Sequence, residues 1–142
     1  MVPAINWLAV ALATISSMIV GAIFYARKVF GTRWIKLAKI DESGMTGRSA
    51  VLPLIITFVV SFITASVLAG SVAIAQEFYQ GSFLLNCVIT AVILWAGFTA
   101  ARLITHDLFE RRPGTLTVLN LLHELITIVV MALIIGAFGY PG

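Results

Sequence analysis

Four long apolar runs divide the chain, and short segments that hold nearly all the charged and turn-forming residues separate them. The runs cover about residues 5–26, 51–75, 83–105 and 116–138. A helix of roughly 20 residues rises 1.5 Å per residue and crosses about 30 Å of hydrocarbon. Because unpaired backbone is too costly in lipid and the runs are too long for barrel strands, each run is expected to be helical. The pattern predicts an all-α membrane protein with four transmembrane helices in one antiparallel bundle, a single domain over residues 1–142.

The composition indicates that lipid, not water, is the solvent of this chain. Hydrophobic residues make up 61% and charged residues only 11%, against about 25% charged in a typical soluble domain. This excludes a disordered chain, a nucleic-acid-binding module and an ordinary soluble enzyme. The single cysteine, Cys87, lies inside an apolar run, so no intrachain disulfide is possible and a buried thiol is expected.

The basic residues fall on one side of the predicted bundle. All nine Lys and Arg residues lie in two segments. Arg27, Lys28, Arg33, Lys36, Lys39 and Arg48 follow the first run, and Arg102, Arg111 and Arg112 lie around the turn that joins the third and fourth runs. Short cytoplasmic loops carry the excess of Lys and Arg in membrane proteins. We therefore expect a multi-pass protein of the inner membrane with both termini and the loop around Glu77 on the non-cytoplasmic side, and the net charge of +3 needs no nucleic-acid partner.

The N-terminal third carries a family resemblance. Asn6-Trp7 opens the first run, the segment Gly21-Ala22-Ile23-Phe24-Tyr25 ends it, and Phe30-Gly31-Thr32-Arg33-Trp34 follows. This pattern resembles the domain of unknown function 1761 family, small four-span bacterial membrane proteins, with Phe24 where that family usually has Trp and Ala26 where Ser is common. The resemblance implies the architecture and a bacterial membrane, and it implies no particular activity.

Aromatic and basic residues flank the first run in a way that is typical of the membrane interface. Trp7 and Tyr25 lie at opposite ends of the run, as interfacial anchors do. Over residues 27–40, apolar residues including Trp34 alternate at helical spacing with Arg27, Lys28, Arg33, Lys36 and Lys39. This spacing predicts an amphipathic basic segment on the inner leaflet, with the lipid bilayer as its partner.

Polar residues inside the last two runs are the candidate functional residues. Glu124 lies well inside the fourth run, where a carboxylate needs a partner, water or a proton. Arg102 and Glu124 are each eleven residues from Pro113, so in an antiparallel hairpin they should lie at the same height and pair. Helical periodicity places further polar side chains beside them, and the candidate site is Arg102, His106, Asn120, His123 and Glu124.

Three functions remain open for this group. The simplest is structural, an ion pair that fastens the third and fourth helices in an accessory protein without transport activity. The second is a proton or small-solute site in a transporter or channel, because His titrates near neutral pH and Glu/His groups occur in proton relays. The third is a membrane enzyme acting on a lipid-like substrate, although no nucleophile and base pair is recognisable. No cofactor and no metal is expected, since His123 and Glu124 are adjacent instead of four residues apart.

The second run has a weakly polar face whose role the sequence leaves open. Thr57, Ser61, Thr64 and Ser71 recur at helical spacing near several small residues. Such a face favours a close helix–helix seam, and a pore lining would need the same residues. A bundle of four helices buries few side chains in its own centre, so we also expect a homo-oligomer.

Overall fold

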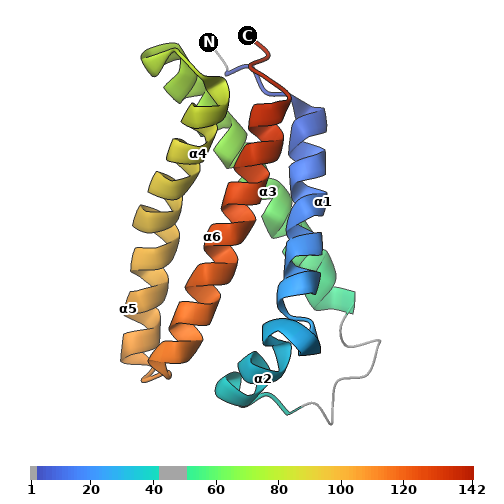
Figure 1. Ribbon diagram of the computed structural model, residues 1–142, viewed down its shortest axis with the longest axis vertical. Helices are drawn as coiled ribbons and strands as arrows, with labels where there is room; N and C mark the ends of the chain where they lie inside the picture. The colour runs from blue at the N-terminus through green and yellow to red at the C-terminus, as the bar shows by residue number, and fades with distance from the viewer. Residues whose placement is uncertain (1–2, 42–50) are drawn as a thin grey trace.

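The computed structural model describes residues 3–41 and 51–142 and consists of helices joined by short turns (Figure 1). In chain order the elements are α1 (Trp7–Phe24), the π-helical turn η1 (Arg27–Gly31), α2 (Thr32–Ala38), α3 (Val51–Tyr79), α4 (Phe83–Leu94), the π-helical segment η3 (Trp95–Ala100), α5 (Ala101–Phe109) and α6 (Gly114–Ala137). α4, η3 and α5 form one continuous span, Phe83–Phe109. Four helices in the described residues are thus long and apolar enough to cross a membrane, which confirms the predicted all-α, four-span architecture.

Short polar side chains define where two of the spans begin. The Asn6 Oδ1 atom accepts a hydrogen bond of 3.1 Å from the backbone N–H of Ala9 at the start of α1. Ser82 Oγ accepts one from the N–H of Leu85 at the start of α4. These caps satisfy backbone donors that have no partner within the helix.

The longest helix, α3, crosses the bundle obliquely behind α1 and α6 (Figure 1). Its 29 residues extend about 44 Å at 1.5 Å per residue, whereas the hydrocarbon layer is about 30 Å thick. A helix that is too long for the bilayer is accommodated by tilting. As a result, α3 packs against α1 and α4 in its second half, and residues 51–60 of its first half are exposed.

Small residues form the helix contacts in the tightly packed half of the bundle, which lies at the end with both termini (Figure 1). Ala9 and Ala13 of α1 are fully buried, as are Ala65 of α3, Ala91 of α4 and Ala132 of α6. Side chains of this size let helix backbones approach closely, which is the main source of packing energy between helices in lipid. The remaining fully buried side chains of this core include Val10, Val72 and Cys87, so the predicted burial of the thiol is confirmed.

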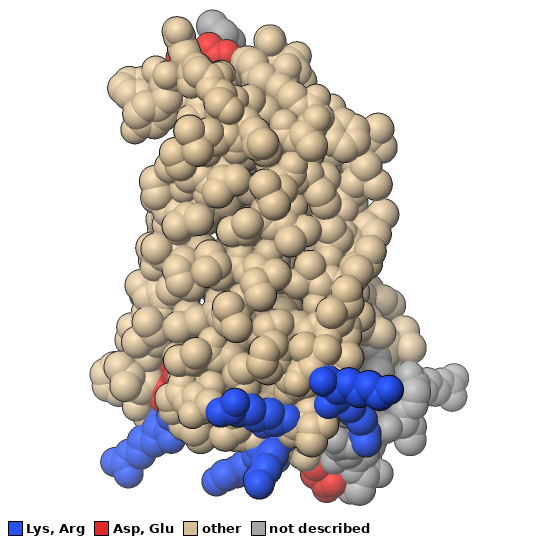
Figure 2. Space-filling view, in the orientation of Figure 1, with Lys and Arg blue, Asp and Glu red and all other residues tan. Residues whose placement is uncertain are grey.

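Charged side chains gather at the opposite end of the molecule. On the face shown in Figure 2, Lys and Arg surround the end that carries α2 and the turn between α5 and α6, and the long middle part bears no charged side chain. Arg48 lies outside the described residues. At the other end, Tyr140 donates a hydrogen bond to Glu77, and this bond raises the pKa of the Tyr140 hydroxyl.

Candidate functional site: a cavity beside α6

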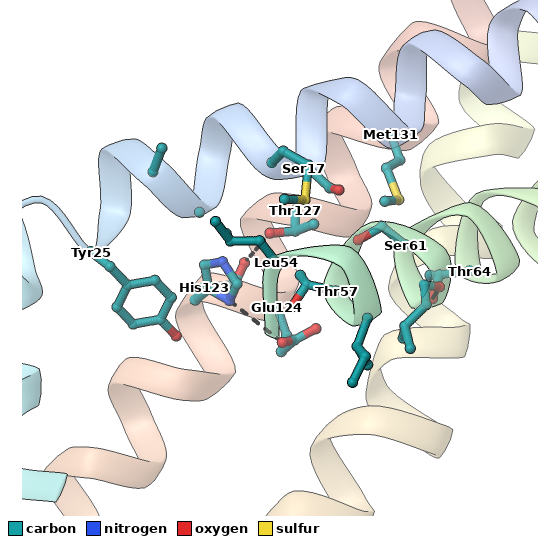
Figure 3. A pocket seen from close by; sticks show the side chains of 15 residues that line it. Ser17, Tyr25, Leu54, Thr57, Ser61, Thr64, His123, Glu124, Thr127 and Met131 are labelled. Carbon is teal, nitrogen blue, oxygen red and sulfur yellow. Dashed lines mark hydrogen bonds and ion pairs between the residues drawn. The ribbon is translucent and has the colours of Figure 1, made fainter. Parts of the chain in front are cut away.

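A cavity of about 570 Å³ lies where the first half of α3 leaves α1 and α6 (Figure 3). Its described lining residues belong to these three helices and to Tyr25, the residue that follows α1. They are Ser17, Met18, Gly21, Ala22, Tyr25, Leu54, Ile56, Thr57, Val60, Ser61, Thr64, His123, Glu124, Thr127 and Met131. Met131 also belongs to the packed core, so the cavity ends where the alanine-rich half of the bundle begins. The tilt of α3 therefore creates the cavity.

Within the cavity, His123 and Glu124 form an adjacent pair. The Nδ1 atom of His123 lies 3.4 Å from Oε1 of Glu124, an ion pair whenever the imidazole is protonated. The imidazole is largely enclosed, with 16% of its side chain exposed, whereas 47% of the Glu124 side chain is exposed. Nε2 of His123 is buried without a hydrogen-bond partner in the described part of the chain. It faces Gly21, since a Cβ atom built there would lie 3.7 Å from it.

Phe24 and Tyr25 contact this imidazole, and Phe30 and Trp34 pack behind them. We call these four side chains the aromatic cluster. The ring centroids of Phe24 and Tyr25 lie 5.2 and 4.8 Å from that of His123. Phe30 packs on Phe24, and Trp34 packs on Tyr25 at 5.0 Å. Several residues that carry the family resemblance therefore lie together beside Asn120 and His123 of α6.

Trp34 also fixes a second polar residue of α6. Its indole Nε1–H donates a hydrogen bond of 3.0 Å to Oδ1 of Asn120. The sequence predicts Tyr25 and Trp34 at the lipid interface, and this stays a prediction. In the fold Tyr25 also lines the cavity and Trp34 also contacts α6. An amphipathic pattern cannot distinguish these positions, because an aromatic stripe looks the same whether lipid or another helix covers it.

A second cavity of about 460 Å³ lies on the other side of Glu124, between α6 and the span formed by η3 and α5. Its described lining residues are Tyr25, Phe98, Thr99, Arg102, Leu103, His106, Asn120 and Glu124. Four members of the predicted site thus line one cavity, and the fifth, His123, lines the other beside Glu124. Tyr25 and Glu124 line both cavities.

The predicted pairing of Arg102 with Glu124 is not what the structure shows. Within the described residues, the ion pair of Glu124 is with His123, and none within 4.0 Å joins it to Arg102. The hairpin is fastened nearer its turn instead. Asp107, 4% exposed, accepts a hydrogen bond of 2.6 Å from Thr117 Oγ1 and lies 3.8 Å from Nε of Arg112.

The π-helical segment η3 lies in the middle of the third span, and the predicted residues Arg102 and His106, both beyond it, line one cavity. Its wider turn interrupts the 3.6-residue period in the middle of the third span, so residues before and after it do not share one face. Thr99, Arg102 and His106 line the second cavity, but Trp95 packs against the core. Glu110, which a regular helix would place beside them, pairs with Arg112 at 2.5 Å at the end of the span.

The polar face that the sequence predicts on α3 has two different surroundings in the fold. Thr57, Ser61 and Thr64 line the cavity. The small residues beside them, among them Ala65 and Ala69, form a seam against the neighbouring helices, as predicted. The hydroxyls were a visible signal, and only the tilt of α3 distinguishes a lining from a seam.

These features define a class: a multi-pass membrane protein of four helices, with a mostly apolar cavity between three of them that contains Glu124 and His123. The family described as "Protein of unknown function (DUF1761)" matches residues 8–136. The chain belongs to this family, as the motif at its first span indicates. No curated protein and no solved structure matches it.

Proposed function

We propose that this protein is a small transporter or channel in which a proton or small solute passes by way of Glu124. The observation that carries the proposal is that two cavities, on either side of α6, meet at Glu124 and Tyr25. A carboxylate within a transmembrane helix costs about 3 kcal/mol on insertion scales. A group that only held the fold together would be expected to bury its partner contact, whereas 47% of the Glu124 side chain is exposed.

Passage across the whole membrane requires movement in the packed half of the bundle. Beyond Met131 the core is closed by fully buried residues of four spans, among them Val10, Val72 and Ala91. The described conformation is therefore closed toward the end with the termini. An alternating-access cycle requires closure at one end in each of its two states.

Glu124→Gln is expected to abolish proton flux, because the amide is nearly isosteric with the carboxylate and cannot take up a proton. The measurement is the decay of a pH gradient in proteoliposomes that enclose a pH-sensitive dye, with valinomycin and potassium to remove the membrane potential. We expect wild-type vesicles to lose the gradient faster than protein-free vesicles, and Glu124→Gln vesicles to match the protein-free rate.

The matched control is Glu110→Gln, the same change at an exposed carboxylate that pairs with Arg112 at the end of the span. It should leave the flux at the wild-type rate, and circular dichroism should show that both variants remain helical. Wild-type flux no faster than that of protein-free vesicles would contradict a proton pathway. Unchanged flux in Glu124→Gln would remove Glu124 from it and favour the structural, accessory role.

The proposed orientation has both termini outside the cytoplasm in the inner membrane, because the basic end carries the Lys and Arg side chains. Tyr79 and Phe109 are 73% and 87% exposed at opposite ends of the bundle. In spheroplasts, a membrane-impermeant maleimide is expected to label Tyr79→Cys directly and Phe109→Cys only after lysis. The wild-type chain, whose Cys87 is buried, gives the background. The opposite labelling pattern would reverse the topology. Homo-oligomerisation stays a prediction.

A further inference from the structure

Three of the hydroxyl groups that line the larger cavity donate their hydrogen within their own helix. Thr57 Oγ1 donates to the carbonyl oxygen of Pro53 at 2.7 Å, Thr64 Oγ1 to that of Val60 at 3.0 Å, and Thr127 Oγ1 to that of His123 at 2.8 Å. A hydroxyl has one hydrogen to donate and two lone pairs to accept with. Because each donor is used within its own helix, these three side chains offer a ligand lone pairs only.

The charged groups in the described lining of the cavity are the carboxylate of Glu124 and, when it is protonated, the imidazole of His123 beside it. None of the described lining residues is Lys or Arg. Arg102 lines the other cavity, which Glu124 also lines. A carboxylate with acceptor oxygens around it favours a cation that carries N–H donors, and it disfavours an anion.

Most of the cavity wall is apolar, and this limits the size and character of the ligand. Leu54, Ile56 and Val60 of α3 face Met18 and Ala22 of α1 across it. Its volume of about 570 Å³ is within the range of roughly 300–1,000 Å³ that holds small organic ligands. The ring of Tyr25 lines the same space and can contact a cation through its face.

We propose that this cavity binds a monovalent organic amine in its protonated form, with the ammonium group at Glu124 and the apolar body between α1 and α3. The inference rests on the proposed function for the role of Glu124 as the binding group, and it names the class of solute. Charge-assisted hydrogen bonds from the ammonium to Glu124 and to the threonine oxygens supply the specificity. The apolar wall supplies the contact area.

Calorimetric titration of the wild-type protein in lipid nanodiscs tests the class of ligand, with empty nanodiscs subtracted. The probes share one phenethyl body: phenethylamine, which is protonated at pH 7, 2-phenylethanol, 3-phenylpropionate and trimethyl(phenethyl)ammonium. We expect the amine to bind about tenfold or more tightly than the alcohol, the quaternary cation to bind more weakly than the amine because it has no N–H donor, and the anion not to bind. Equal binding of amine and alcohol, or preferred binding of the anion, would overturn the proposal.

Variants locate the binding in the cavity. Glu124→Gln should lose amine binding, Thr57→Val should weaken it, and the control Glu110→Gln should leave it unchanged. Because Thr57→Val keeps the charge at Glu124 and replaces an exposed hydroxyl, it tests the site even where Glu124→Gln is poorly folded. Amine binding that survives both substitutions would place the ligand elsewhere. Amine binding without proton flux would uphold this inference and refute the proton pathway, whereas proton flux without amine binding would uphold the proton pathway and refute this inference.

Discussion

Gly31→Ala is expected to destabilise the protein by about 3 kcal/mol or more, although it adds one methyl group. Gly31 is buried at the end of η1, where the chain turns back on the end of α1. A Cβ atom built there would overlap the carbonyl oxygen of Tyr25 and would lie 2.8 Å from the Tyr25 carbonyl carbon and 3.0 Å from that of Ala26. All three contacts are backbone, so no side chain can rotate to relieve the overlap.

The substitution should also damage the candidate site. Separating η1 from α1 moves Tyr25 and the aromatic cluster away from His123, so ligand binding should fall together with stability. Stability can be measured by heating the detergent-solubilised protein and following the reaction of Cys87, which is fully buried in the fold, with a thiol-reactive dye. Gly114→Ala is the matched control, because a Cβ atom there has no neighbour within 4 Å. Equal melting curves for the two variants would show that η1 does not pack as described.

Gly136→Ala is expected to destabilise the closed half of the bundle by about 1–3 kcal/mol. A Cβ atom at Gly136 of α6 would lie 2.5 Å from Cδ1 of Leu84, 3.0 Å from its Cα and 3.4 Å from Sγ of Cys87. The leucine side chain can move, but its Cα cannot move unless α4 shifts away from α6. The expected result is a lower melting temperature and earlier exposure of Cys87.

Amine binding at the candidate site is expected to distinguish Gly136→Ala from Gly31→Ala. Gly136 lies at the opposite end of α6 from the Tyr25 and His123 contacts, so amine binding to the folded protein should be kept in Gly136→Ala and lost in Gly31→Ala. The same Gly114→Ala control applies. A Gly136→Ala protein as stable as the wild type would mean that α4 and α6 are further apart than described.

Sequence reasoning found the polar residues of the site but not their partners. The stripe of Asn120, His123 and Glu124 was visible because polar residues in an apolar run are conspicuous. Their contacts were not, since Trp34 and Tyr25 come from a segment about 90 residues away, and no local pattern relates the two. The buried acid at the hairpin, Asp107, was not among the predicted site residues, because its contacts with Thr117 and Arg112 are visible only in the fold.

The amino-acid sequence alone determined that the chain is a four-span membrane protein with its basic residues on one side. Insertion into lipid depends on the length and polarity of each segment and on where the charges lie between segments, and all of these can be read residue by residue. Only the tertiary structure decided that Thr57 and Tyr25 line a cavity, that Trp34 binds Asn120 and that His123, not Arg102, is the partner of Glu124. These outcomes depend on the tilt of α3 and the wider turn of η3, which result from close packing between helices distant in sequence.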